Sequence, residues 1–104
     1  MKHYEVEVYV GTKGKTSPRG NLSSILAFDR TGLTKKDMEN IYLTLDMEMA
    51  DPDLDWAVAE VWIDGMYEFQ VALYRYNDFY GNFMVLNIVQ CGKVCTIRSY
   101  VEAA

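Results

Sequence analysis

The side chains best suited to chemistry in this sequence are carboxylates, and they are concentrated in the middle of the chain. Residues 37–68 contain ten acidic side chains and no basic one, whereas residues 1–36 contain seven basic and three acidic side chains. Charge segregation of this kind favours association with an oppositely charged surface and has little influence on the fold. The candidate partner-binding residues are Asp37, Glu39, Asp46, Glu48, Asp51, Asp53, Asp55 and the adjacent Trp56.

Three of these carboxylates alternate with other residues in the segment Asp51–Asp55. If the segment is extended, residues two apart point the same way and lie about 6–7 Å from each other, which is twice the ~3.4 Å rise per nucleotide of a DNA strand. Calcium binding is a rival interpretation, but the segment lacks the glycine and the closing glutamate of a calcium loop. A solvated acidic face without a partner is a further interpretation that the sequence leaves open.

Catalytic residues are sparse. The single histidine, His3, lies near the N-terminus, and no nucleophile–base pair is visible in the sequence. Glu60 is the one catalytic alternative, because a strand would place it on the same face as Trp62, and a turn at Asp64–Gly65 would place it opposite Phe69. Aromatic surroundings would raise the pKa of this carboxyl. We therefore expect a protein that is not an enzyme and holds no metal or cofactor, with a small ligand-binding or enzymatic domain centred on Glu60 as an alternative.

The glycine-rich segment Gly11–Gly20 does not predict a nucleotide site. A phosphate-binding loop needs a longer spacer than the two residues between its first two glycines, and Pro18 follows where a helix would have to open. The basic side chains of this loop, Lys13, Lys15 and Arg19, could contact phosphates, but three charges in a net-acidic protein are more typical of a solvated loop. We expect no direct binding of nucleic acid.

One helix is predicted over about residues 34–50. Thr34 and Asp37 have the spacing of a capping box at its start, and Pro52 stops it. Leu43 and Met47 lie on the side opposite the main apolar face and could contact a partner. The apolar face comprises Met38, Ile41, Tyr42, Leu45 and Met49.

Alternating apolar residues predict the strands that surround this helix. They are expected over residues 3–10, 24–29, 56–63, 66–76, 83–90 and 94–102. On the fourth strand, Tyr67 is expected on the same face as Phe69, Val71 and Leu73. The order ββαββββ predicts a single α+β domain over residues 1–104, in which an antiparallel sheet of five or six strands carries one amphipathic helix on one face.

Two cysteines, Cys91 and Cys95, are too few for a disulfide scaffold or a four-ligand zinc site. They are expected as reduced, buried thiols. No window is long and apolar enough for a membrane span, so we expect a cytoplasmic protein.

Part of the chain resembles a known family. The segment Val8–Thr12, a lysine-bearing loop that closes at Gly20–Leu22, and an apolar strand that ends at Ala27–Asp29 resemble the opening of the ArdA antirestriction proteins. The acidic helix and Trp56–Glu60 extend the likeness over about residues 6–64. The resemblance implies a protein carried by a mobile element that imitates DNA and blocks restriction enzymes through an acidic surface.

These observations lead to one functional expectation and one further alternative. The expected function is a non-enzymatic inhibitor, of phage or mobile-element type, whose carboxylates occupy the basic, nucleic-acid-binding surface of a host defence nuclease, in an antirestriction or anti-CRISPR-like role. The alternative is a homo-oligomeric structural or adaptor domain, a homodimer through a tyrosine-rich sheet face.

Overall fold

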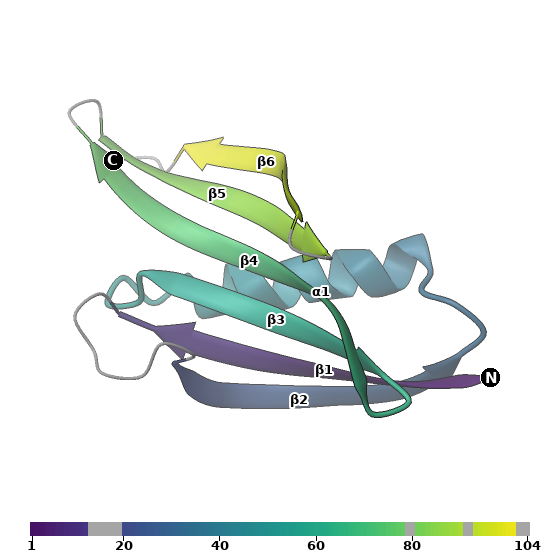
Figure 1. Ribbon diagram of the computed structural model, residues 1–104. Coiled ribbons are helices and arrows are strands. Elements are labelled where there is room, and N and C mark those ends of the chain that lie inside the picture. The colour runs from purple at the N-terminus through teal and green to yellow at the C-terminus, as the bar shows by residue number, and fades with distance from the viewer. Residues whose placement is uncertain (13–19, 79–80, 91–92, 102–104) are drawn as a thin grey trace.

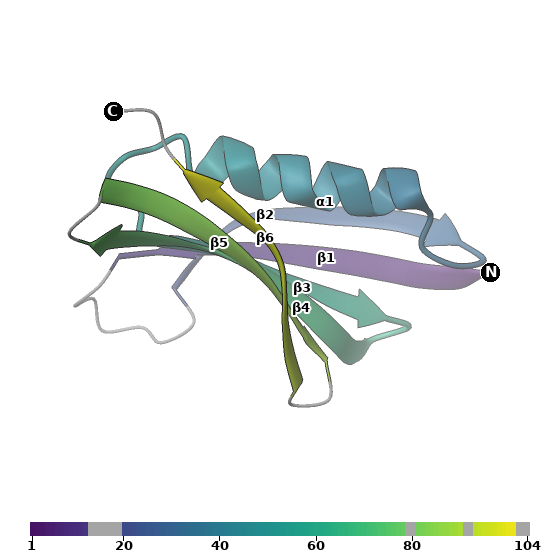
Figure 2. The same ribbon diagram turned by 90° about the horizontal axis from the view of Figure 1, so that it is seen from above.

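The residues that the structure describes form a six-stranded antiparallel sheet with one helix on one face (Figure 1). The computed structural model describes residues 1–12, 20–78, 81–90 and 93–101. The strands lie in the order β2-β1-β3-β4-β5-β6, and Figure 2 shows the sheet twisting beneath α1. The α+β class, with an antiparallel sheet and a single helix, is confirmed. The elements are β1 (Lys2–Gly11), β2 (Asn21–Arg30), α1 (Lys35–Glu48), β3 (Trp56–Ile63), β4 (Met66–Asp78), β5 (Gly81–Gln90) and β6 (Lys93–Val101).

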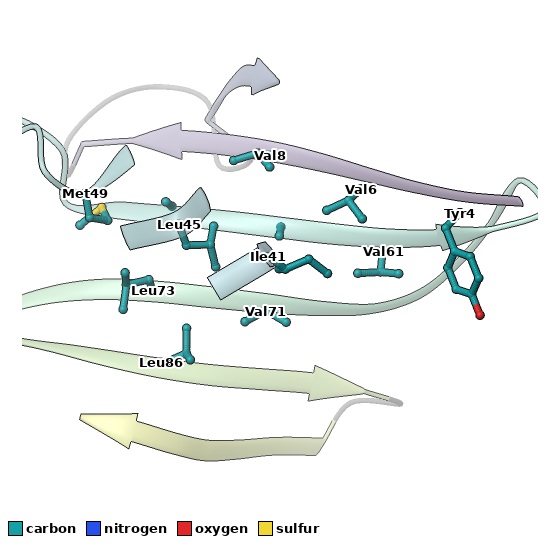
Figure 3. Packing of buried hydrophobic residues seen from close by; sticks show 12 residues of the cluster. Tyr4, Val6, Val8, Ile41, Leu45, Met49, Val61, Val71, Leu73 and Leu86 are labelled. Atoms are coloured by element: carbon teal, nitrogen blue, oxygen red, sulfur yellow. The ribbon is translucent and has the colours of Figure 1, made fainter. Parts of the chain in front are cut away.

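The core fills the space between α1 and the sheet (Figure 3). The helix contributes Ile41, Leu45 and Met49, which are buried as the helical spacing predicts. On β3 the buried residues Ala57 and Ala59 lie in the same cluster, and their small side chains leave room for α1. The remaining fully buried side chains of the cluster come from the four central strands: Tyr4, Val6, Val8, Val61, Val71, Leu73 and Leu86.

The predicted capping box at the start of α1 is confirmed. The Thr34 Oγ1 accepts a hydrogen bond from the Asp37 backbone N–H at 3.1 Å, and the Asp37 carboxylate accepts one from the Thr34 N–H at 3.1 Å. Two N–H groups that no helical carbonyl can reach are thereby paired.

The β3–β4 hairpin turns at Asp64 and Gly65, with φ of 49° and 81°, as the Asp-Gly pair predicts. A bulge follows, because Val61 pairs with Phe69 while the next residue of β3, Trp62, pairs with Tyr67. The prediction that Tyr67 shares a face with Phe69 is therefore wrong.

The same bulge changes the position of Glu60. This residue lies opposite Gln70, and the prediction that it faces Phe69 is wrong. One extra residue in a strand reverses the alternation of faces beyond it, and nothing in the local composition announces the insertion.

Two glycines let the chain pass close to Trp56, at the end of the sheet where β1 ends and β2 begins. A Cβ atom built on Gly11 or on Gly20 would lie 2.1 Å from a carbon of the Trp56 ring, and Gly20 also has a φ of 84°.

The strand β2 starts at Asn21, earlier than predicted, because Asn21 pairs with Val10 of β1. The basic loop side chains and Cys91 lie outside the described residues, as does the side chain of Cys95.

Candidate acidic interface

The segment Asp51–Asp55 is a turn and not the extended row that the alternation of carboxylates predicts. The Leu54 N–H donates to the Asp51 carbonyl at 3.2 Å, and the Asp51 carboxylate accepts a hydrogen bond from the Asp53 N–H at 2.9 Å. Aspartate favours this local pattern because its short side chain reaches the backbone two residues on. The chain therefore curls here, and the carboxylates do not follow a straight, DNA-like spacing.

Arg75 of β4 holds this turn against the body of the protein. Its guanidinium donates to the carbonyl of Met49 at 2.6 Å and to that of Leu54 at 3.1 Å. The backbone N–H of Arg75 donates to the Asp55 carbonyl at 2.8 Å, and the backbone N–H of Asp55 donates to the Gly11 carbonyl at 2.9 Å. The acidic turn is thus fixed at both ends by the sheet.

Arg75 was not among the predicted site residues. It is the only basic residue between Lys36 and Lys93, and that isolation is the signal that could have found it. A lone cation on a strand that follows an acidic block is a candidate to contact that block.

Asp37 lies away from the acidic turn. Its side chain is only 6% exposed and is 3.4 Å from the Arg30 guanidinium. The hydrogen bond from the Thr34 backbone, with help from Arg30, lowers the pKa of this carboxyl below its usual value. The Asp37 carboxylate is therefore already paired with Thr34 and Arg30 at the start of α1. Glu39 is exposed nearby, in the first half of the helix.

The other predicted carboxylates gather around the C-terminal end of α1. Asp51 and Asp53 are exposed, while Asp55 is half-buried. We call this group the acidic end, and it comprises Asp46, Glu48, Asp51, Asp53 and Asp55.

Two features mark the helix part of the acidic end. The Glu48 carboxylate accepts a hydrogen bond from the Ser23 hydroxyl at 2.6 Å, which places it beside β2. The last turn of α1 contains no basic residue. Carboxylates near a helix C-terminus face its partial negative charge, which typically costs about 0.3–1 kcal/mol each. The acidic end is therefore retained at some expense of helix stability.

Trp56 is a packing residue beside the acidic end. Its half-buried ring lies against the backbone of Gly11 and Gly20, so it packs where β1 ends and β2 begins. It is not a protruding anchor.

Glu60 lies on the helix-free face, between Glu7 of β1 and Gln70 of β4. It is 8% exposed, and the Trp62 indole N–H donates to its carboxylate at 3.3 Å. Burial and the nearby Glu60 charge raise the pKa of the Tyr67 hydroxyl. A groove of about 370 Å³ between β2 and α1 lies on the other side of the sheet and does not include Glu60.

Neither a metal-binding cluster nor a helix able to cross a membrane is found in the part of the chain that the structure describes. Among the side chains that the structure describes, no three from His, Cys, Asp or Glu are grouped as a metal site. Among the described residues, no helix has the length and apolar character that a membrane crossing requires.

Comparison with known proteins identifies no relative. No protein-family model, no curated protein and no solved structure matches the chain.

Proposed function

We propose that this protein is a non-enzymatic inhibitor, of phage or mobile-element type, whose acidic end occupies the basic, nucleic-acid-binding surface of a host defence nuclease in the cytoplasm. The observation that carries the proposal is the fixed acidic turn. Arg75 bonds the carbonyls of Met49 and Leu54 and leaves the carboxylates of Asp51 and Asp53 exposed.

Fixing the backbone of a charged surface favours binding. A flexible acidic loop would lose conformational entropy when it docks, at roughly 1–2 kcal/mol per ordered residue, whereas the Asp51–Asp55 turn is ordered beforehand. Acidic complementarity to a nuclease surface would raise the association rate and select basic partners.

The position of the charges also supports a role beyond solubility. Asp46 and Glu48 lie where the helix dipole disfavours them, and a solubilising charge would serve equally well at the other end of α1. The resemblance of residues 6–64 to ArdA antirestriction proteins supports the same class of target, whether a restriction or a CRISPR nuclease.

The experiment compares two triple variants that remove the same charge. One neutralises the turn, with Asp51→Asn, Asp53→Asn and Asp55→Asn. Asparagine keeps the side-chain carbonyl that the Asp53 N–H requires. The matched control neutralises three exposed carboxylates at the opposite end of the sheet, with Glu5→Gln, Asp29→Asn and Glu68→Gln.

The measurement is the plating efficiency of unmodified phage on bacterial hosts that carry one restriction or CRISPR system each. The wild-type protein and the control variant should raise plating on at least one such host, and the turn variant should not. With the nuclease of that host purified, the turn variant should bind about tenfold or more weakly, with a flatter salt dependence. Equal inhibition by both variants would contradict the proposal.

A further inference from the structure

The face of the sheet opposite α1, the helix-free face, is apolar over β3, β4 and β5. In an antiparallel sheet with a helix layer on one side only, the outward side chains are normally polar. Here the outward positions of these strands alternate with the buried residues of the core, and most of them are aromatic or aliphatic. They include Trp56, Val58, Trp62, Tyr74, Tyr76 and Phe83.

No element that the structure describes covers this face, since α1 lies on the other side (Figure 2). Tyr67, which the bulge pairs with Trp62, is 44% exposed, and Tyr76 is 41% exposed. Ile25 of β2 lies opposite Glu7 on the same face and is 53% exposed. Aromatic and aliphatic side chains left in water over several neighbouring strands indicate a contact surface.

Two carboxylates lie in the middle of the helix-free face. Glu7 of β1 and Glu60 of β3 are directly opposite each other. The Tyr9 hydroxyl donates to the Glu7 carboxylate at 2.8 Å, and the Trp62 indole N–H donates to the Glu60 carboxylate at 3.3 Å. Both of these donors are neutral, so these hydrogen bonds do not compensate the two negative charges.

The other described charges of this face add no lysine or arginine. His3 is the only basic side chain that the structure describes there, and it is shared between Asp29 at 2.9 Å and Glu5 at 3.7 Å. Lys2 and Arg30 pair with each other on the helix side, where Arg30 faces α1. Among the described side chains, the helix-free face is therefore apolar with a net negative charge.

This charge selects a basic partner. A second copy of the chain docked through the same face would place Glu7 and Glu60 of both copies in one interface, where the described side chains of the face provide no lysine or arginine to meet them. The same carboxylates would repel nucleic acid. A protein segment with basic side chains would supply positive charge and would cover the apolar rings at the same time.

Trp62 favours arginine among the basic side chains. Its ring meets the Tyr67 ring with 5.7 Å between the centroids and an interplanar angle of 77°, so the two rings form a corner beside the Glu60 carboxylate. A guanidinium is planar, so it can stack on an aromatic ring while its N–H groups donate to a carboxylate. An ammonium is a compact and more strongly hydrated charge, and it gains less from the ring.

We propose that the helix-free face docks an arginine-bearing segment of another protein, with one guanidinium against Trp62 and paired with the carboxylates of Glu60 and Glu7. The rings of Tyr74 and Tyr76 contact the rest of the segment. This contact depends neither on the acidic end, which lies around the C-terminal end of α1, nor on the proposed inhibition of a nuclease.

The test compares two synthetic peptides, in which serine alternates with arginine or with lysine. A length of about ten residues lets several basic side chains point to the same side of an extended chain. Isothermal titration calorimetry at low ionic strength should show that the wild-type protein binds the arginine peptide about threefold or more tightly than the lysine peptide, because only the guanidinium stacks on the Trp62 ring.

Variants of the face assign the binding to these residues. Glu7→Gln with Glu60→Gln should weaken binding of the arginine peptide about tenfold, while glutamine keeps the oxygen to which Tyr9 and Trp62 donate. Trp62→Leu should bring the two peptides to the same affinity, whereas Trp62→Tyr should retain part of the preference for arginine. Circular dichroism checks that every variant is folded.

A variant of the acidic end tells the two acidic surfaces apart. Asp51→Asn with Asp53→Asn removes the same charge as the Glu7 and Glu60 variant. Loss of the arginine preference in this variant would place the peptide at the acidic end and overturn the proposal.

Three other results would also overturn it. They are equal affinity of the wild-type protein for the two peptides, unchanged affinity in the Glu7 and Glu60 variant, and a dimer in sedimentation velocity that Trp62→Leu dissolves. The last result would mean that a second copy covers the face. The plating assay depends on the acidic end, so it can fail while the arginine peptide still binds, and the reverse also holds.

Discussion

Replacing Arg75 should detach the acidic turn and destabilise the whole domain. Arg75→Met keeps the aliphatic stem and removes the guanidinium that donates to the carbonyls of Met49 and Leu54 at 2.6 and 3.1 Å. A third contact, to the Asp51 carbonyl at 3.4 Å, is too long to contribute much. The substitution also removes the cation that lies near the C-terminal end of α1.

The expected cost is about 2–4 kcal/mol. A hydrogen bond from a charged group contributes roughly 1.5–3 kcal/mol, and two such bonds are lost at a half-buried site where water can replace part of each. At about 4 °C per kcal/mol for a domain of this size, the melting temperature should fall by roughly 8–16 °C. Arg75→Lys should recover less than half of the loss, because an ammonium lacks the fork that reaches two carbonyls.

The assay is urea unfolding followed by tryptophan fluorescence, in which Trp56 reports from beside the turn. Arg30→Met is the control, since the Arg30 side chain is 46% exposed and faces Asp37 at 3.4 Å, and its loss should cost less than about 1 kcal/mol. The reasoning is refuted if Arg75→Met unfolds at the same urea concentration as the wild type, or if Arg75→Lys matches the wild type.

Two further predictions concern packing and pH. Gly11→Ala should destabilise the protein by about 1–3 kcal/mol in urea unfolding, because the new Cβ would lie 2.1 Å from the Trp56 ring. The control is Gly32→Ala, where a new Cβ would meet no atom within 4 Å, and it should change stability by less than about 0.5 kcal/mol. The His3 ring donates a hydrogen bond from Nδ1 to the Asp29 carboxylate at 2.9 Å, which raises the pKa of His3 above 6.5. The stabilisation is therefore complete below pH 6.5 and is lost as the pH rises through the higher folded-state pKa. NMR titration of the His3 ring in the Asp29→Asn variant should show a lower pKa, and an unchanged value would contradict the assignment.

Local sequence predicted the elements whose signals are contained in a few neighbouring residues. The capping box at Thr34 and Asp37 and the buried stripe of α1 form as expected, because their partners lie within four residues. The Asp64–Gly65 turn forms for the same reason, since it depends on the φ angles of two residues.

The wrong predictions concern residues whose position depends on contacts with a distant strand. The bulge in β4, opposite Val61 and Trp62, turns Tyr67 away from the core. The register of β3 and β4 requires this bulge, and that register is set by the pairing of the two whole strands. The Asp51–Asp55 segment curls through the local hydrogen bonds of Asp51, but its position against the sheet is set by Arg75, which bonds the Leu54 carbonyl from 21 residues later in the chain.

The sequence by itself determined that this protein is an α+β domain with one amphipathic helix and a block of carboxylates in mid-chain. Composition and short-range periodicity suffice for that, because backbone preferences and side-chain alternation act locally. Only the tertiary structure decided which carboxylates lie together. The Arg30 guanidinium lies 3.4 Å from the Asp37 carboxylate at the start of α1, and Arg75 holds the Asp51–Asp55 turn at the other end. The tertiary structure also left the β2 side of α1 open, because the area that one helix covers depends on how six strands twist beneath it.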